Sequence, residues 1–171
     1  MKTEIETERK FIILMPDISK LADFKNYRAD AIEQIYLPAE EGRTHRIRSR
    51  RTSDGVIYTE TEKIRISKSS AIEKEGEITE ERFLSLRKEM LYGTAVINKT
   101  RHSFEYRGQV FEIDIYPEWK RTAIMEAELP DENASFEVPS EIKIVREVTG
   151  DRNYSNAGMA RVFPPEDEVY L

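Results

Sequence analysis

The sequence has no cysteine and only two histidines among its 171 residues. The lack of cysteine excludes disulfides, thiolate nucleophiles and zinc sites built on cysteine, and it fits a cytoplasmic protein. Two histidines are too few for a His-rich metal site. His45 and His102 lie on strand faces opposite to their neighbouring arginines, so we expect them to pack or to lie at the surface. Any catalytic or metal site must therefore be built from other side chains.

The sequence also lacks a long apolar run and a broad excess of basic residues. No stretch approaches the roughly 18 apolar residues of a membrane span, and residues 1–4 do not begin an apolar leader. The net charge is −6 and the sequence pI is about 5.2, which argues against nonspecific binding to nucleic acid or to anionic membranes. We expect a soluble, cytoplasmic protein with neither partner, in which any phosphate ligand meets a local basic site.

Strands of alternating charged and apolar residues make up most of the chain. Charged residues account for 35% and hydrophobic residues for 39% of a length that suits a single domain, 1–171. The alternation, with hairpin turns at Ser53-Asp54-Gly55 and Arg107-Gly108, predicts a mainly β fold with a few short helices. The expected strands cover residues 6–14, 31–37, 43–51, 56–66, 73–77, 95–106, 109–116 and 122–129. The expected helices lie within residues 15–21, 79–87, 131–135 and 151–161, before a loose tail at 163–171.

The first predicted strand has an ionic face and an apolar face. Glu6, Glu8 and Lys10 point one way in an extended strand, while Phe11 and Ile13 point the other way. Two carboxylates about 7 Å apart can help to hold a hard divalent cation, and the neighbouring ammonium can reach an anion bound to that cation. Considered alone, the strand is better explained by a solvated charged face on an antiparallel sheet.

Other strands repeat the pattern with the two charge signs kept apart. The acidic pairs are Glu6/Glu8, Glu112/Asp114 and Glu126/Glu128, and the basic residues are Lys10, Arg46, Arg48, Lys63, Lys99 and Arg101. If the opposite, apolar faces pack under the helices, the charged faces turn inward and line a closed barrel. Charge inside a barrel costs stability unless it is complemented. The pattern therefore predicts carboxylates that hold Mg²⁺ or Mn²⁺ and basic groups that bind a polyanion.

An ordered set of short motifs runs along the chain. The motifs are Glu6-x-Glu8-x-Lys10, Gln34-Ile35-Tyr36-Leu37, Arg46-x-Arg48, Thr61-x-Lys63, Glu75-x-Glu77, Lys99-x-Arg101, Glu112-x-Asp114, Glu126-x-Glu128 and Asp151-Arg152-x-Tyr154-x-Asn156. In this order they resemble the signature of the CYTH superfamily, the triphosphate tunnel metalloenzymes. The resemblance spans Glu6 to Asn156. It implies an eight-stranded antiparallel β-barrel tunnel that binds the triphosphate of its substrate and depends on a divalent metal.

The resemblance also implies roles for individual side chains. The implied metal ligands are Glu6, Glu8, Asp114, Glu126 and Glu128, with Glu112 nearby. The implied triphosphate contacts are Lys10, Arg46, Arg48, Lys63, Lys99, Arg101 and Arg152. Glu8, Lys63 and Asp114 are the catalytic candidates, and both a carboxylate and a Lys63 with lowered pKa stay open as the proton acceptor. No specific role is assigned to Glu75 and Glu77, because the segment before them is longer than in compact members.

The expected function is metal-dependent hydrolysis of the terminal phosphoanhydride of a linear triphosphate. Inorganic tripolyphosphate is the first choice, because the small chain has no evident region for a base or a thiamine ring. A nucleoside or thiamine triphosphatase and an adenylate cyclase of the same fold are alternatives, as is a noncatalytic polyphosphate-binding module. The expected partner is a small-molecule triphosphate, and a homodimer stays open.

Overall fold

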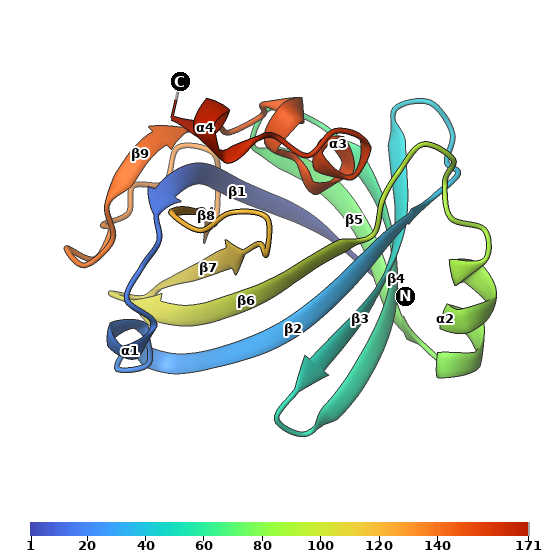
Figure 1. The fold of residues 1–171 in the computed structure, drawn as a ribbon, viewed down its shortest axis with the longest axis horizontal. Coiled ribbons are helices and arrows are strands. Elements are labelled where there is room, and N and C mark those ends of the chain that lie inside the picture. Colours follow the sequence, from blue (N-terminus) through green and yellow to red (C-terminus); the bar gives the residue numbers. More distant parts are fainter. Residues whose placement is uncertain (171) are drawn as a thin grey trace.

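Nine antiparallel strands form one sheet in the computed structural model, which describes residues 1–170. The strand order is β5-β4-β3-β2-β6-β7-β8-β1-β9, and β1 also pairs with β5. Eight strands therefore close into a barrel, and β9 is added beside β1 (Figure 1). The strands are β1 (Lys2–Leu14), β2 (Lys25–Leu37), β3 (Arg43–Thr52), β4 (Gly55–Arg65), β5 (Ser70–Ile78), β6 (Ile97–Tyr106), β7 (Gln109–Ile115), β8 (Thr122–Glu128) and β9 (Ile144–Glu147). The predicted mainly β barrel of eight strands is confirmed.

Strand β1 closes the barrel because its two halves have different partners. Residues 2–7 pair with β5, and residues 8–14 pair with β8. The predicted alternation holds along this strand. Phe11 and Ile13 are buried in an apolar cluster on the outside of the barrel, whereas Glu6, Glu8 and Lys10 line its interior. The charged face of the strand is thus turned inward, as the sequence predicted.

An apolar cluster covers the outer faces of β1, β6, β7 and β8. Phe104, Phe111 and Met125 are almost fully buried there, and Leu21 of helix α1 (Ile18–Leu21) packs against them. The segment that follows β8 contributes Ile142 to the same cluster. Burial of these side chains supplies the apolar driving force that lets the opposite, charged faces form the lumen.

Helix α2 (Glu80–Arg87) covers a second outer patch, on β2 and β3 (Figure 1). The Thr79 hydroxyl accepts a hydrogen bond from the Arg82 amide, so the helix begins where its predicted cap lies. Phe83 is its buried residue, and it packs with Ile35 and Ile47. The clearest helix of the sequence is therefore confirmed, together with its cap.

Apolar side chains fill the barrel interior at one end. Ile12, Tyr36 and Ile124 lie there on the inward parity of their strands, against Met159 and Val169. The last two residues come from helices α3 (Asn156–Arg161) and α4 (Glu166–Val169), which lie across this end of the barrel with the short η1 (Arg152–Tyr154) (Figure 1). The charged part of the lumen is therefore bounded on one side by a packed apolar plug.

Two expectations about the last third of the chain are wrong. Residues 131–135 form turns and not a helix, since the Asp131 side chain accepts the Asn133 amide and gives the backbone an alternative partner. Residues 163–170 are not a loose tail. Phe163 packs on Trp119, and Val169 is completely buried. Position 171 of the expected tail lies outside the described residues.

In the described part of the chain, every helix is too short or too polar to cross a membrane.

Candidate active site

A cavity of about 1160 Å³ follows the inside of the barrel. It is lined by most of the charged residues that the sequence singled out: Glu6, Glu8, Lys10, Arg46, Arg48, Lys63, Arg101, Glu112, Glu126, Glu128 and Arg152. All but Arg152 come from barrel strands, where two-residue spacing aims alternate side chains to the same side. Arg152 begins η1. Antiparallel pairing thus gathers around one cavity charges that are far apart in the sequence.

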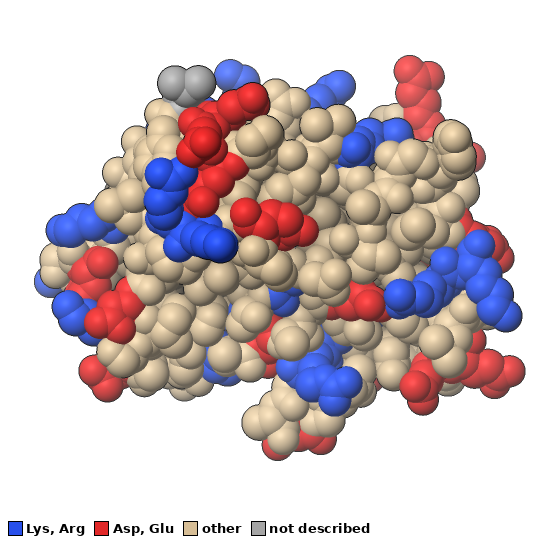
Figure 2. All heavy atoms as spheres, viewed as in Figure 1, with Lys and Arg blue, Asp and Glu red and all other residues tan. Residues whose placement is uncertain are grey.

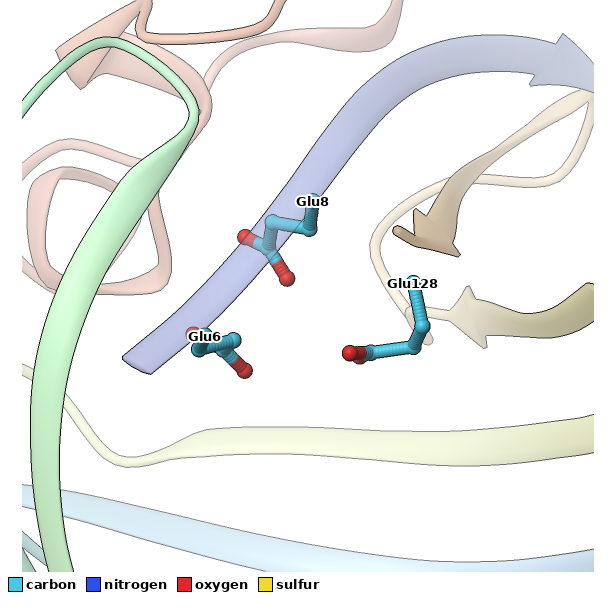
Figure 3. A group of neighbouring side chains, drawn as sticks. All are labelled: Glu6, Glu8 and Glu128. Atoms are coloured by element: carbon cyan, nitrogen blue, oxygen red, sulfur yellow. The ribbon is translucent and has the colours of Figure 1, made fainter. Parts of the chain in front are cut away.

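Glu6, Glu8 and Glu128 form a carboxylate cluster in this cavity, on strands β1 and β8 (Figure 3). One carboxylate oxygen from each lies within 4.8 Å of the oxygens of the other two. Glu8 and Glu128 are directly opposite each other in the β1–β8 register, and Glu6 precedes Glu8 on the same face. Three hard oxygen donors at this spacing suit a divalent cation that keeps several of its waters. The donor set therefore fits the predicted metal.

The protonation of this cluster depends on burial. Burial raises the pKa of Glu128 to about 9 and that of Glu8 to about 7, and repulsion from neighbouring carboxylates adds to both shifts. The pKa of Glu6 is lowered, because the adjacent Lys63 ammonium outweighs the effect of burial. The cluster carries protons near neutral pH that a bound cation would displace.

Arg46 and Arg48 extend from β3 toward carboxylates of β5. Arg46 Nη2 lies 3.3 Å from Glu73 Oε1, and Arg48 Nη2 lies 2.7 Å from Glu75 Oε2. The same Glu75 oxygen accepts a 2.6 Å hydrogen bond from the Thr61 hydroxyl. Burial and the nearby Arg46 lower the pKa of Arg48 to about 10, so both guanidinium groups are cationic at neutral pH. Glu73 and Glu75 thus hold the two arginines in place.

Lys10 and Lys63 are the two ammonium groups nearest the carboxylate cluster. Lys63 Nζ contacts Glu6 and lies 3.2 Å from Glu73 Oε1, while Lys10 Nζ lies 2.9 Å from Glu126 Oε1. Burial disfavours both charges, but the surrounding carboxylates outweigh it and raise the pKa of each lysine. Lys63 is therefore a cation here and not an amine with lowered pKa, which favours a carboxylate as the proton acceptor.

Arg101 ties together carboxylates of β7 and β8, the strands next to β1 in the barrel. Its Nε lies 2.7 Å from Asp114 Oδ1 and its Nη2 lies 3.2 Å from Glu126 Oε2, while Nη1 contacts Glu112. Lys99 Nζ donates a 2.7 Å bond to Asp114 Oδ2, and both of these side chains are only 1% exposed. Lys99 and Asp114 are absent from the residues that line the cavity. The structure thus places them behind its surface, apart from the carboxylate cluster.

Comparisons with known proteins agree with this geometry. No family model matches the chain. An inorganic triphosphatase from Acetivibrio thermocellus is 42% identical over 74 residues, which are 43% of this chain and 46% of that protein. The match thus spans less than half the length of that relative. The solved structure of the inorganic triphosphatase NE1496 is 28% identical, covers 93% of this chain and 96% of its own, and has a TM-score of 0.59.

A further solved structure shares the fold. The PH1819 protein from Pyrococcus horikoshii OT3 is 24% identical, with a TM-score of 0.56 over 75% of this chain and 80% of its own. The closed barrel, the ordered motifs and the nearly full-length match to NE1496 agree with one another. Over almost its whole length, the chain is therefore similar to the inorganic triphosphatase NE1496.

The role of Glu73 was not predicted from the sequence. The residue was placed on a predicted strand with Glu75, but its contacts with Arg46 and Lys63 depend on the β4–β5 register, in which Lys63 is opposite Glu73. The available signal was parity, since Glu73 and Glu75 share a strand face as the inward-facing pairs do. Side-chain alternation showed that Glu73 and Glu75 share a strand face, but it did not show which lysine and arginine side chains they contact.

Both histidines lie against neighbouring polar side chains, as expected. His45 Nε2 lies 2.8 Å from Glu60 Oε1, and His102 Nδ1 lies 2.9 Å from the Tyr27 hydroxyl. Both lie on the parity opposite to the inward arginines of their strands. Neither histidine belongs to the cluster formed by Glu6, Glu8 and Glu128.

Proposed function

We propose that this protein hydrolyses the terminal phosphoanhydride of a linear triphosphate, with inorganic tripolyphosphate as its substrate. One observation carries the proposal: a carboxylate cluster and a set of buried arginines and lysines face the same cavity. The first can hold a divalent cation, and the second can neutralise a polyanion. The similarity to two proteins described as inorganic triphosphatases supports the same activity.

The basic residues supply the binding site for the phosphates. Arg46, Arg48 and Arg101 each use some of their N–H groups on carboxylates and keep others for a ligand, since a guanidinium carries five donors. Lys10 and Lys63 offer compact charges beside the carboxylate cluster. Together these groups would orient the chain of phosphates and stabilise the charge that develops on its oxygens during in-line attack by water.

Glu6, Glu8 and Glu128 would hold the divalent cation, which we propose to be Mg²⁺ or Mn²⁺. When bound, such a cation polarises phosphoryl oxygens and lowers the pKa of coordinated water. The chain's own part would be to fix the ligands and to provide a carboxylate that accepts a proton from the attacking water, with Glu8 as the first candidate because it lies in the cluster beside Lys10 and Lys63. We place the protein in the cytoplasm, in line with its lack of cysteine.

Orthophosphate release tests the proposed function directly. We expect release from tripolyphosphate in Mg²⁺ or Mn²⁺, less release from ATP and thiamine triphosphate, and none in chelator. Pyrophosphate and cyclic AMP should be assayed on the ATP samples. Cyclic AMP with pyrophosphate would instead assign a cyclase. Saturable tripolyphosphate binding without turnover on any substrate would assign a binding module.

Metal binding should be coupled to proton release. The pKa values of about 7 for Glu8 and about 9 for Glu128 mean that protons occupy the cluster near pH 7, and ionised carboxylates are needed to bind a cation. The affinity for Mn²⁺ is therefore expected to rise between pH 6 and 8, by up to about tenfold per unit for each proton displaced. Calorimetric titration in two buffers of different ionisation enthalpy measures the released protons. A pH-independent affinity with no proton release would contradict the raised pKa values.

A further inference from the structure

The Gln34-Ile35-Tyr36-Leu37 motif contains buried polar groups that none of the proposed roles uses. Gln34 is completely buried on β2, and its Nε2 lies 2.7 Å from the Tyr36 hydroxyl. Ile32 and Tyr36 flank Gln34 on the same strand face, and both line the cavity. Gln34 therefore lies on the inward face of the barrel, between two residues that line the cavity, but it is itself absent from that lining.

Among the described residues, three buried side-chain polar atoms have no hydrogen-bond partner: Gln34 Oε1, Arg46 Nε and Ser103 Oγ. Two of the three adjoin Tyr36, because Gln34 is bonded to its hydroxyl and Arg46 is directly opposite it in the β2–β3 register. Buried polar groups in native proteins are nearly always paired, so two neighbouring exceptions beside a cavity need an explanation.

Rotating the Gln34 carboxamide does not remove the problem. In one orientation Nε2 donates to Tyr36 and Oε1 is left without a partner. In the other orientation the Tyr36 hydroxyl donates to Oε1, and Nε2 is left with free N–H groups. The second arrangement becomes fully satisfied if one ligand accepts hydrogen bonds from both Gln34 Nε2 and Arg46 Nε.

We propose that Gln34, Tyr36 and the Nε–H of Arg46 form a subsite for one phosphoryl group of the bound triphosphate. The inference rests on the proposed function, because it takes the ligand to be a triphosphate. A phosphoryl group suits the subsite because its oxygens only accept, whereas Gln34 Nε2 and Arg46 Nε only donate. Tyr36 acts as a positioning residue, since its hydroxyl fixes the carboxamide in the donating orientation.

Two variants test the subsite, Gln34→Leu and Tyr36→Phe. Each is expected to raise KM for tripolyphosphate about tenfold, as befits loss of a hydrogen bond to a charged ligand, with a smaller change in kcat. Gln34→Leu removes one unpaired buried oxygen but also leaves the Tyr36 hydroxyl without its 2.7 Å partner, so its Tm without ligand is expected to fall only slightly. The rise in Tm that tripolyphosphate causes in chelator should shrink in both variants.

Asn98→Leu is the control. Asn98 is exposed on β6 and is absent from the residues that line the cavity. We expect wild-type KM and a wild-type ligand-induced rise in Tm. The same result for Gln34→Leu and Tyr36→Phe would overturn the subsite, as would a loss of ligand-free stability with KM unchanged. If the wild type binds tripolyphosphate without releasing orthophosphate, the proposed hydrolysis fails, but the Tm measurement in chelator still decides on the subsite.

Discussion

Replacing Glu8 with glutamine is expected to lower metal-dependent orthophosphate release from tripolyphosphate by about 10²–10³-fold. Glu8 contributes an oxygen to the three-carboxylate cluster and is also the first candidate for proton acceptor. Glutamine keeps the shape but supplies neither a charge nor a basic oxygen. Mn²⁺ affinity, measured by calorimetry, should fall in the same variant. Because burial already disfavours the ionised form of Glu8, the Tm in chelator should not fall.

Glu4→Gln is the control for that experiment. Glu4 has the same strand parity on β1 as Glu6 and Glu8, but its side chain is 54% exposed and pairs with the exposed Lys2. An exposed pair of this kind contributes little, so activity, Mn²⁺ affinity and Tm should match the wild type. Wild-type activity in Glu8→Gln would remove Glu8 from the catalytic site. Loss of activity with unchanged Mn²⁺ affinity would instead limit its role to proton transfer.

The barrel was predictable from the sequence because strand alternation is a local property. Whichever partner it pairs with, a strand such as β1 must put Phe11 and Ile13 on one side and Glu6 and Glu8 on the other. Elements without that alternation were missed. Strand β9 has only four residues, and the first part of β2, residues 25–30, has no regular pattern of charged and apolar positions. Its pairing with β6 depends on tertiary context.

The packed C-terminal segment was missed for a similar reason. Phe163 and Val169 stand alone among prolines and acidic residues, and an isolated apolar residue gives no periodic signal. Their burial depends on the apolar plug built by distant segments, including the β7–β8 connection, where Trp119 Nε1 donates a 2.9 Å bond to the Pro164 carbonyl. Local polarity indicated a tail, and long-range packing overrode it.

The members of the site were easier to predict than their pairings. Strand parity identified Lys99 and Arg101 as inward-facing, but they differ in depth along the barrel. Arg101 reaches the cavity, whereas Lys99 lies two residues nearer the apolar plug and is enclosed with Asp114. Burial and attraction to Asp114 oppose each other at Lys99; burial prevails and lowers its pKa to about 8. Such depth follows from strand register and tilt, which single-strand patterns do not specify.

Replacing Arg101 with methionine is expected to lower the free energy of unfolding by about 3–5 kcal/mol. The Arg101 guanidinium is buried and contacts Asp114, Glu112 and Glu126. Methionine keeps much of the apolar stem but leaves those carboxylates without their shared cation, and an uncompensated buried charge is far more costly than the pair is favourable. Urea unfolding followed by circular dichroism measures the loss, and KM for tripolyphosphate should rise in the folded fraction.

Arg87→Met is the matched control for this stability measurement. Arg87 is 42% exposed at the end of α2, where it pairs with Glu33, and an exposed pair contributes less than about 1 kcal/mol. An unfolding free energy equal to that of the wild type in Arg101→Met would contradict this prediction. It would mean that protons or water stabilise the carboxylates of Glu112, Asp114 and Glu126 at little cost in free energy. If that variant does not fold, Arg101→Lys keeps the charge but loses the bidentate contact with Asp114, made by Nε at 2.7 Å and Nη2 at 2.8 Å. Intermediate stability in the lysine variant is then expected, because the carboxylates need both the charge and the planar geometry of arginine.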